Sequence, residues 1–394
     1  MLLHLEIITP VHIGAGKEKD YIKDIDYVED NDRKRLSFIK HEYIQDEFHS
    51  MNEAEKSRWI SIVTSNSGLS IQNLKEIENS FKKRQLPSIY RQYNAPNFAI
   101  PDTIKRNIYG ALDNKPYIPG SSIKGAIRSV LLKVLIQELN ISKSKVTTKD
   151  TFGTIENDIL QYLQVSDAIF SKIAYYNSKI FNIATHKNGG EGGWKNTRST
   201  DEKRQDNQFN TVYECIRKDE LNTTTFQLKI DLDRIQLLLK QSKEPGIPDK
   251  IKKLNAAFGR LSTEPGNHSA EELSKKLTNR LLKIINEHSK QHLVKELGFY
   301  KQYDDAQDTD LIIDKYNEIK QLVDTAPEGT AYIKLGQGTG FHLITGDYQH
   351  TINYIQVVET GEHKQKRKSR KIGIARDAAG NLDLFPFGWV KISV

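Results

Sequence analysis

Hydrophobic and polar residues alternate over residues 3–7, which read Leu-His-Leu-Glu-Ile. A period of two predicts a strand with one buried face and one exposed face. Thr9-Pro10 ends this pattern, and residues 12–16 (His-Ile-Gly-Ala-Gly) follow as a glycine loop. The segment is therefore expected to be a core strand with a glycine loop at its end.

The most regular helical pattern covers residues 121–139. Apolar residues recur there three and four positions apart, which places them on one stripe of an α-helix. The stripe consists of Ile123, Ala126, Ile127, Val130, Leu131, Val134 and Leu135. Ser121 or Ser122 is expected to cap the first turn.

Helical spacing also runs through residues 41–84 and through most of residues 234–322. Shorter segments carry a β-type pattern and are expected to form strands. These segments lie near residues 36–39, 163–170, 224–232, 332–335, 341–344, 352–358, 372–375 and 389–393, with a turn at 379–381.

The order of these elements indicates the fold class. Strand, helix and strand follow one another twice, with long insertions, which predicts an α+β fold with a ferredoxin-like or RRM-like core. We expect residues 1–346 to form this core, with helical insertions at about 41–100 and 234–322. Residues 347–394 are expected to form a C-terminal β-meander, an extension packed on the core.

Composition narrows the class of protein. The 394 residues include 37% hydrophobic and 28% charged side chains, enough for a sizeable core beneath a very polar surface. The net charge of +7 favours a polyanionic partner without requiring one. A single cysteine, Cys215, excludes an intramolecular disulfide and a cysteine-based zinc site and fits a cytoplasmic location. No signal-peptide pattern or run of ~18 apolar residues is present, so no membrane partner is expected.

Two cations lie near the start of the 121–139 helix. Lys124 and Arg128 are four residues apart, where the helix dipole and free backbone N–H groups favour an anion, so together they form a candidate phosphate clamp. Gly120 and Gly125 leave room for a sugar-phosphate backbone. Spacing alone favours a plainer interpretation, in which the helix is capped and amphipathic and both cations are solvated.

Two glycine loops are further candidates. Residues 336–340 (Gly-Gln-Gly-Thr-Gly) cluster backbone donors suited to phosphate or ribose oxygens, although a plain hairpin turn fits equally well. The spacing is not that of a dinucleotide-binding fingerprint. Because this loop, residues 12–16 and the start of the 121–139 helix each adjoin a predicted core element, the three are expected to line one groove.

Two basic stretches could also contact RNA. Residues 363–371 contain six Lys or Arg in nine positions, which suits phosphate binding but also suits a solvated hairpin tip. Residues 81–93 interleave Lys and Arg with Phe and Tyr, as in proteins that stack bases, although a linker packed on the core is equally plausible.

The sequence contains few groups of residues that could carry out catalysis. Asp20, Asp24 and Asp26 are candidates for Mg²⁺, His4 and His12 for a general base, and His288 with His292 for a metal. Surface, loop or helix roles are favoured for all of them. Neither a Walker motif nor a zinc-ligand set is present. We therefore keep an endoribonuclease function only as the alternative to the function of an RNA-binding subunit.

Several motifs together resemble the RAMP superfamily of CRISPR effector subunits. They are Thr-Pro-Val-His-Ile-Gly-Ala-Gly at 9–16, Tyr-Ile-Pro-Gly-Ser-Ser-Ile-Lys-Gly-Ala-Ile-Arg at 117–128, Phe-Gly-Thr at 152–154, Val-Ser-Asp-Ala at 165–168 and the glycine-rich loop at 336–340. The resemblance implies an RRM-like core that binds RNA. The RNA-contact residues that it implies, together with the residue patterns above, are His12, Gly14, Gly16, Ser121, Ser122, Lys124, Gly125, Arg128, Gly336, Gly338, Thr339 and Gly340.

Within this superfamily, the chain resembles the subunits that cap the crRNA 3′ end in type III-A Csm complexes. The length, the opening motif, the first helical insertion and Gly-Trp-Val-Lys at 388–391 carry this resemblance. It implies four partners: the 3′ portion of crRNA, the backbone RAMP subunit, the small helical subunit and a host exonuclease for crRNA maturation. No cofactor and no catalysis are expected, because residues 21–26 lack the Arg-Asp-Pro-like context of the target-cutting subunits.

Overall fold

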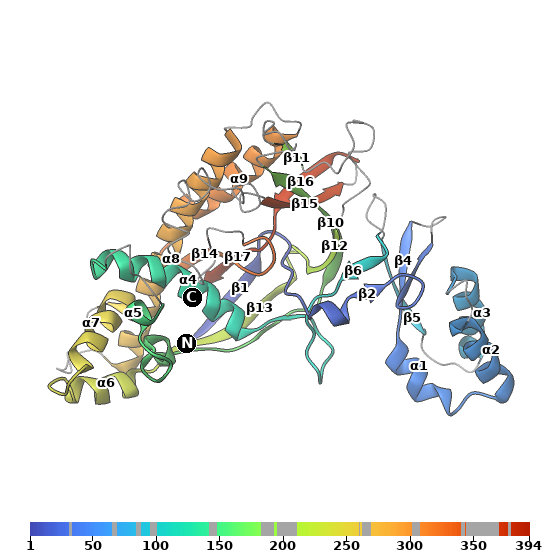
Figure 1. Cartoon of the computed structure of the whole chain (residues 1–394), viewed down its shortest axis with the longest axis horizontal. Helices are drawn as coiled ribbons and strands as arrows, with labels where there is room; N and C mark the ends of the chain where they lie inside the picture. The colour runs from blue at the N-terminus through green and yellow to red at the C-terminus, as the bar shows by residue number, and fades with distance from the viewer. Residues whose placement is uncertain are drawn as a thin grey trace, which may run out of the picture.

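A five-stranded antiparallel sheet forms the centre of the computed structural model (Figure 1). Its order is β14-β17-β1-β13-β8, with bounds Thr330–Lys334, Trp389–Ser393, Leu2–Ile7, Thr223–Ile230 and Leu163–Val165. Leu3 and Leu5 are fully buried and Leu2 is 58% exposed, so the alternation predicted for the first strand is confirmed. The structure describes all residues except 31–33, 65–68, 84–87, 95–100, 142–147, 183–192, 195–210, 260, 262–268, 302–307, 340–342, 344–369 and 377–379.

Helices cover one face of this sheet. The predicted helix is present as α4 (Gly120–Glu138), and the 234–322 region forms α6 (Leu232–Lys240), α7 (Ile247–Phe258), α8 (Ala270–Lys301) and α9 (Thr309–Asp324). Residues Leu3, Leu5 and Ile7 of β1 share one apolar cluster with Ile123 and Ile127 of α4. The helix α4 therefore packs against the sheet through its apolar stripe.

A second, mixed sheet lies beside the first. Its order is β16-β15-β10-β12-β6-β2, and β11 (Gly193–Trp194) pairs with β10. The bounds are Leu382–Pro386, Arg370–Arg376, Ile173–Asn182, Thr211–Ile216, Thr103–Lys105 and Tyr21–Ile22. A cluster that includes Ile312 of α9, Leu293 of α8 and Ile372 of β15 joins this sheet to the helical layer.

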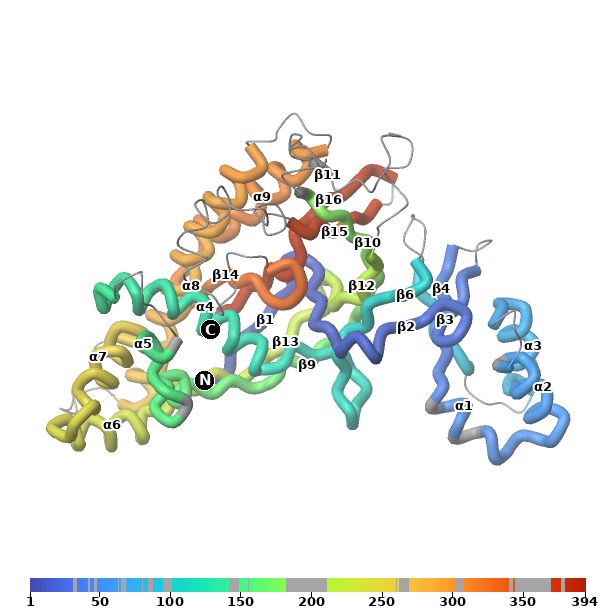
Figure 2. Tube along the Cα trace, in the orientation of Figure 1, coloured from blue at the N-terminus to red at the C-terminus, as the bar shows by residue number. Residues whose placement is uncertain are grey.

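The first insertion forms a separate lobe at one end of the molecule (Figure 2). It contains β3 (Tyr27–Asp30), β4 (Arg35–Ile39), α1 (His41–Phe48), α2 (Glu53–Val63), α3 (Ile71–Lys83) and β5 (Tyr90–Asn94). The helical pattern of residues 41–84 is confirmed. The linker interpretation of residues 81–93 is wrong in part, because β5 pairs with β4, a non-local pairing that no local pattern reveals.

Small elements connect these layers. They are η1 (Lys17–Lys19), β7 (Tyr117–Ile118), α5 (Thr148–Phe152), η3 (Ile155–Asn157), η4 (Ile159–Tyr162) and β9 (Ala168–Ile169). β7 pairs with β9, which brings the loop that contains Asp167 against the start of α4.

The N-terminal cap of α4 differs from the expectation. Pro119 occupies the cap position, and no side chain of the local sequence caps the first turn. Instead, Gly120 N donates to Asp167 Oδ1 at 2.7 Å. The predicted Ser121 or Ser122 cap is therefore wrong, because a carboxylate 47 residues away satisfies this N–H.

The tail is divided between two sheets. β15 and β16 form a hairpin in the second sheet, whereas β17 lies between β14 and β1 in the first. This arrangement differs from the single meander that we expected. Four expected features lie wholly or mostly outside the described residues: the 341–344 and 352–358 strands, the basic run at 363–371 and Gly340. No described helix has both the length and the apolar character that a membrane span requires.

Candidate nucleic-acid interface

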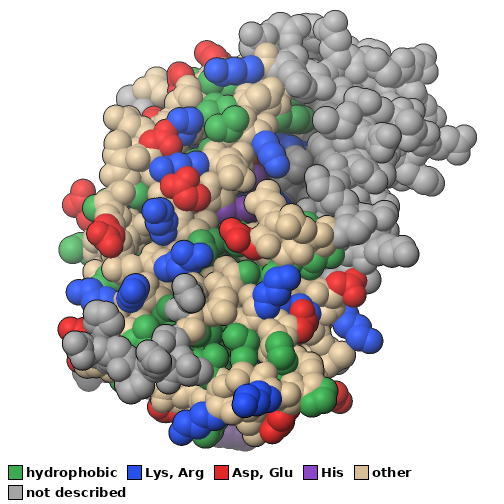
Figure 3. All heavy atoms as spheres, turned by 90° about the vertical axis from the view of Figure 1, so that its left-hand side faces the viewer, with side chains coloured by type: hydrophobic (Ala, Val, Ile, Leu, Met, Phe, Trp, Pro, Cys, Tyr) green, Lys and Arg blue, Asp and Glu red, His purple; other side chains and the backbone are tan. Residues whose placement is uncertain are grey.

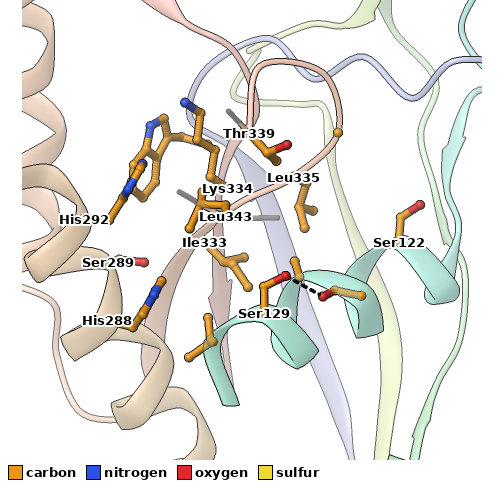
Figure 4. Close-up of a pocket in the computed structure, with 15 residues that line it drawn as sticks. Ser122, Ser129, His288, Ser289, His292, Ile333, Lys334, Leu335, Thr339 and Leu343 are labelled. Carbon is orange, nitrogen blue, oxygen red and sulfur yellow. Dashed lines mark hydrogen bonds between the residues drawn. The ribbon is translucent and has the colours of Figure 1, made fainter. Parts of the chain in front are cut away.

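A cavity of about 310 Å³ lies between α4, α8 and the segment that follows β14 (Figure 4). Of the sequence-predicted contact residues, Ser122 and Gly125 reach it from α4, and Gly336 and Thr339 reach it from the glycine loop. Residues more than 200 positions apart thus line one hollow. Of the three segments expected to line one groove, α4 and the C-terminal glycine loop do so, whereas residues 12–16 do not line this cavity.

The two glycine loops contact each other through their backbones. Gln337 N donates to the carbonyl oxygen of His12 at 2.9 Å. Gly336 has a φ of +64°, and a Cβ there would lie 2.3 Å from His12 O, so only glycine fits this approach. Gly338 also has a positive φ. Gly14 and Gly16 are exposed at the surface.

The His12 side chain is buried rather than presented to a ligand. Its Nδ1 lies 2.7 Å from the carbonyl oxygen of Glu214. Burial lowers the pKa of His12 to about 4, against an opposing effect of the Glu214 hydrogen bond. The imidazole is therefore neutral near pH 7 and anchors the first glycine loop to β12.

Lys124 and Arg128 lie side by side but on a different face of α4 from the cavity. Arg128 Nη1 is 2.5 Å from Asp158 Oδ2, and its guanidinium stacks 4.2 Å from the centroid of Phe152. Partial burial lowers the pKa of the Lys124 ammonium. Arg128 is thus already held by a carboxylate, and Lys124 is the more available cation of the two.

Gly125 has no steric reason to be glycine. An added Cβ would meet nothing within 4 Å, although glycine in a helix interior is less favourable than alanine. Gly120 differs, because a Cβ there would lie 2.2 Å from the carbonyl oxygen of Val165. The open space over Gly125 is what a closely approaching ligand backbone requires, whereas Gly120 is used for packing within the protein.

We expect Gly125→Ala to raise the free energy of unfolding by about 0.5–1 kcal/mol, because alanine restores helix propensity without a clash. Gly120→Ala on the same helix should instead lower it by about 1–3 kcal/mol, because the new methyl group overlaps Val165 O. Chemical denaturation of both variants measures the difference. Equal effects of the two substitutions would contradict this explanation of the two glycines.

Lys334 was not identified from the sequence. It lies at the end of β14, lines the cavity, and is only 5% exposed. Within the described part of the chain, its ammonium has neither a hydrogen bond nor a salt bridge. Burial lowers its pKa to about 8, with Glu296 opposing and Arg370 adding to the decrease. A buried ammonium that lines a cavity is a suitable partner for an anion.

The two histidines of α8 lie across the cavity from α4 (Figure 4). Burial lowers the pKa of His288 to about 3, and Lys133 and Lys295 lower it further. Among the described residues, no three His, Cys, Asp or Glu side chains are grouped as a metal site. His288 and His292 therefore contribute walls to the cavity, and we assign no metal to them.

Of the three aspartates that were considered for Mg²⁺, Asp20 and Asp26 line one cavity between residues 18–43 and the second sheet, and Asp24 does not line it. Asp20 pairs with Lys105, and Asp26 accepts from Ile22 N and pairs with His41. Asp24 has a φ of +61° in a turn. None of the three lines the cavity beside α4, and the carboxylate paired with Arg128 is Asp158 rather than one of them.

Charge on the helical side of the molecule is mixed. Figure 3 shows Lys and Arg side chains interspersed with Asp and Glu over the face that carries α6 and α7. The net charge of +7 is therefore not concentrated in a single patch on this face.

Comparisons with known proteins give consistent results. A sequence model of the RAMP superfamily matches residues 4–339. The CRISPR system Cms protein Csm5 of Methanocaldococcus jannaschii is 27% identical over 293 residues. That match spans 67% of this chain and 66% of the archaeal protein, just under two thirds of its length.

Two solved structures share the fold. One is a chain of the cryo-EM structure of a Csm-crRNA-target RNA ternary complex from a type III-A CRISPR-Cas system, with a TM-score of 0.59 and 15% identity over 100% of both chains. The other is the crystal structure of T. onnurineus Csm5, with a TM-score of 0.54 and 15% identity over 98% of this chain and 99% of that one. At this identity, the likeness establishes the fold alone.

Proposed function

The chain belongs to the RAMP superfamily, and from this premise we propose that it is a non-catalytic crRNA-binding subunit of a type III-A Csm effector complex. In this role it caps the 3′ end of the effector filament and assists crRNA 3′ maturation in antiviral defence. The observation that carries the proposal is the cavity where α4, the C-terminal glycine loop and Lys334 meet. The similarity to Csm5 and to a chain of a crRNA-containing complex supports the choice of ligand.

We propose a ferredoxin-like core for the first sheet. In such a core, two strand-helix-strand units give the strand order 4-1-3-2. The order β17-β1-β13-β8 has this form if α4 and α8 are the two core helices and β14 is an added edge strand. Residues 1–346 would then form the core, with insertions at about 41–100 and 234–322. Residues 347–394 would be the C-terminal extension, and this extension contributes one strand, β17, to the core sheet.

The proposed RNA path uses three surfaces. The exposed backbone at Gly14 and Gly16 leads to the first turns of α4, where Ser121, Ser122, Lys124, Gly125 and Arg128 lie. The path then reaches the glycine loop with Gly336, Gly338, Thr339 and Gly340, of which the last is outside the described residues. His12 acts through its backbone and its anchoring contact, because its ring is buried.

Protein partners follow from the same proposal. A capping subunit meets the backbone RAMP subunit and the small helical subunit, and an exonuclease acts on the RNA end that it leaves exposed. A cytoplasmic site of action belongs to this proposal.

The first test uses a labelled crRNA-like single strand and a salt series. Wild-type protein should bind it with an affinity that falls steeply with salt, because phosphate contacts dominate. Lys124→Ala/Arg128→Ala should weaken binding about tenfold and flatten the salt dependence by about one to two phosphate contacts. Lys124→Ala should account for most of the loss, because Arg128 is already paired with Asp158.

A matched control is Lys275→Ala/Lys276→Ala, which removes two exposed cations from α8 about 20 Å along the helix from His288. This variant should bind like the wild type. RNA should remain intact with and without Mg²⁺. Mg²⁺-dependent fragments that persist through purification would contradict the non-catalytic role and would favour an endoribonuclease.

A further inference from the structure

A second cavity, of about 410 Å³, lies where the first insertion meets the second sheet. Its aromatic lining comes from both parts of the molecule. We name it the tyrosine pocket and define it by Tyr21, Phe38, Tyr93, Tyr109, Tyr175 and Glu214. Arg91 and Tyr93, from the basic-aromatic stretch at 81–93, line this cavity, whereas the contact residues that the family resemblance implies do not.

A single buried carboxylate organises the tyrosines. The phenols of Tyr109 and Tyr175 each donate to Glu214 Oε1 at 2.9 Å, and Tyr21 donates to the same atom at 3.4 Å. Asn107 N donates to Oε2 at 2.9 Å. Burial raises the pKa of Glu214, while these hydrogen bonds oppose the increase. Burial also raises the pKa of each phenol, so the rings stay protonated donors in fixed positions.

The rings form a partly assembled stack. Phe38 lies parallel to Tyr175, with centroids 4.6 Å apart and an interplanar angle of 11°. Tyr93 meets Tyr175 edge-on at 5.2 Å, and Tyr93 is only half-buried. Phe38 also stacks with Tyr27 and is only 5% exposed, so Tyr93 is the ring of this group that offers an accessible face to an unstacked nucleobase.

Cations complete the pocket. The Arg106 guanidinium lies 5.1 Å from the Tyr21 ring and 5.7 Å from the Tyr109 ring. Unlike Arg128, it has no salt bridge to a carboxylate in the part of the chain that the structure describes. Arg91 is exposed and also lines the cavity. A guanidinium held by aromatic rings remains able to bind a phosphate.

The tyrosine pocket is continuous with the first glycine loop. Ala15 N donates to the carbonyl oxygen of Arg106 at 3.1 Å, and Ile13 N donates to Asn107 Oδ1 at 2.8 Å. The next residues of the chain, Glu18 to Tyr21, line the pocket itself. An RNA strand that follows the loop at Gly14 and Gly16 would therefore pass close to the pocket, because the protein residues that line it begin only a few positions after this loop.

We propose that the tyrosine pocket binds one unstacked nucleotide of the single-stranded RNA that passes the 12–16 loop. The base stacks on the half-buried ring of Tyr93, and Arg106 or Arg91 binds its phosphate. This inference rests on the proposed RNA-binding function and adds a site for an individual nucleotide to it. The alternative of a purely structural network, which only joins the insertion to the second sheet, makes a different prediction.

The test uses full-length protein and single-stranded RNA carrying 2-aminopurine. Tyr93→Leu should weaken RNA binding about tenfold and abolish the change in 2-aminopurine fluorescence, because a stacking face is lost. Tyr93→Phe should restore both, because the ring remains. Arg106→Gln, which leaves the aromatic stack in place, should reduce the salt dependence of binding by about one contact.

Tyr90→Leu is the matched control. Tyr90 lies on the same strand but packs against the apolar cluster of α1 to α3 rather than the pocket, so the same substitution tests for general damage to the insertion. This control should bind RNA like the wild type. Thermal unfolding of each variant shows whether the fold is kept.

The outcomes separate the two proposals. If the wild type binds RNA and Tyr93→Leu and Arg106→Gln both bind it equally well, the pocket is only structural and the crRNA-binding function stands. If the wild type does not bind RNA, both proposals fail. A second arm uses adenosine monophosphate: Tyr93-dependent binding of the free nucleotide that RNA does not displace would show that the ligand is a small nucleotide and would overturn the RNA assignment.

Discussion

Glu296→Gln is expected to lower the free energy of unfolding by about 3–5 kcal/mol at neutral pH, the cost of removing one partner of a buried ion pair. Glu296 Oε2 lies 2.7 Å from Arg370 Nε, and the two side chains are 2% and 6% exposed. The pair joins α8 to β15, so the substitution removes the Glu296 charge from the buried Arg370 guanidinium between the two layers. Lys334 also loses a favourable neighbour.

The pH dependence gives an independent check. Burial acts to raise the pKa of Glu296, but Arg370, His292 and Lys334 outweigh it and lower this pKa to about 2. The folded state thus holds the carboxylate more acidic than the unfolded chain, whose pKa is near 4.5. The stabilisation is present above pH 4.5 and is lost as pH falls toward 2.

Urea unfolding of wild type and Glu296→Gln at several pH values measures both effects. The difference between them should shrink across the acidic window. The double variant Glu296→Leu/Arg370→Met should regain part of the loss, because it removes the Arg370 charge together with the Glu296 charge, while Lys334 stays buried without Glu296. A single variant as stable as the wild type would contradict the role assigned to this ion pair.

Lys334→Met should change stability and RNA affinity in opposite directions. Folding lowers the pKa of Lys334 from 10.5 to about 8, so the folded state disfavours the charged ammonium. A neutral side chain of similar length removes this penalty and should raise the free energy of unfolding at neutral pH by about 1–3 kcal/mol. The lost charge should weaken RNA binding about tenfold or more, because a charge-assisted contact to phosphate is removed.

The sign of the pH effect follows from the same pKa. Unfolded chains bind more protons than the folded state between pH 8 and 10.5, so this contribution makes stability rise with pH over that window. RNA affinity should fall as pH rises through 8, where the ammonium loses its proton. Burial also lowers the pKa of Lys133 and Lys371 to about 8, so some pH dependence should remain in the variant.

Calorimetric unfolding and RNA titration of wild type and Lys334→Met at pH values on both sides of 8 measure these effects. The difference in RNA affinity should be largest below pH 8 and should narrow above it. A variant that keeps wild-type RNA affinity at neutral pH would show that Lys334 does not reach the ligand.

The periodic spacing of hydrophobic residues predicted the elements that such spacing alone defines. β1 and α4 follow from periodicity alone, because one buried face repeats every two residues or every three to four. The convergence of Gly125 with Gly336 was also foreseeable, since both lie at ends of core elements. Whether RNA contacts these residues stays a prediction.

Features that depend on distant residues could not be predicted in this way. The cap that Asp167 supplies to α4 comes from a loop 47 residues further along the chain. The burial of Lys334 and the convergence of three tyrosines on Glu214 depend on which strands become neighbours. A lysine at the end of a strand and a glutamate in a Tyr-Glu-Cys run give no signal of burial by themselves.

The position of β17 has a consequence for synthesis on the ribosome. Residues 389–393 lie between β14 and β1 and pair with both strands. Translation must therefore proceed almost 390 residues beyond β1 before the edge of β1 that faces β17 can be paired. At about 5–20 residues per second, the nascent chain carries this open edge for about 20–80 s. During this interval the edge is available to chaperones or to other nascent strands, and a chain that stops before residue 389 would keep it open permanently.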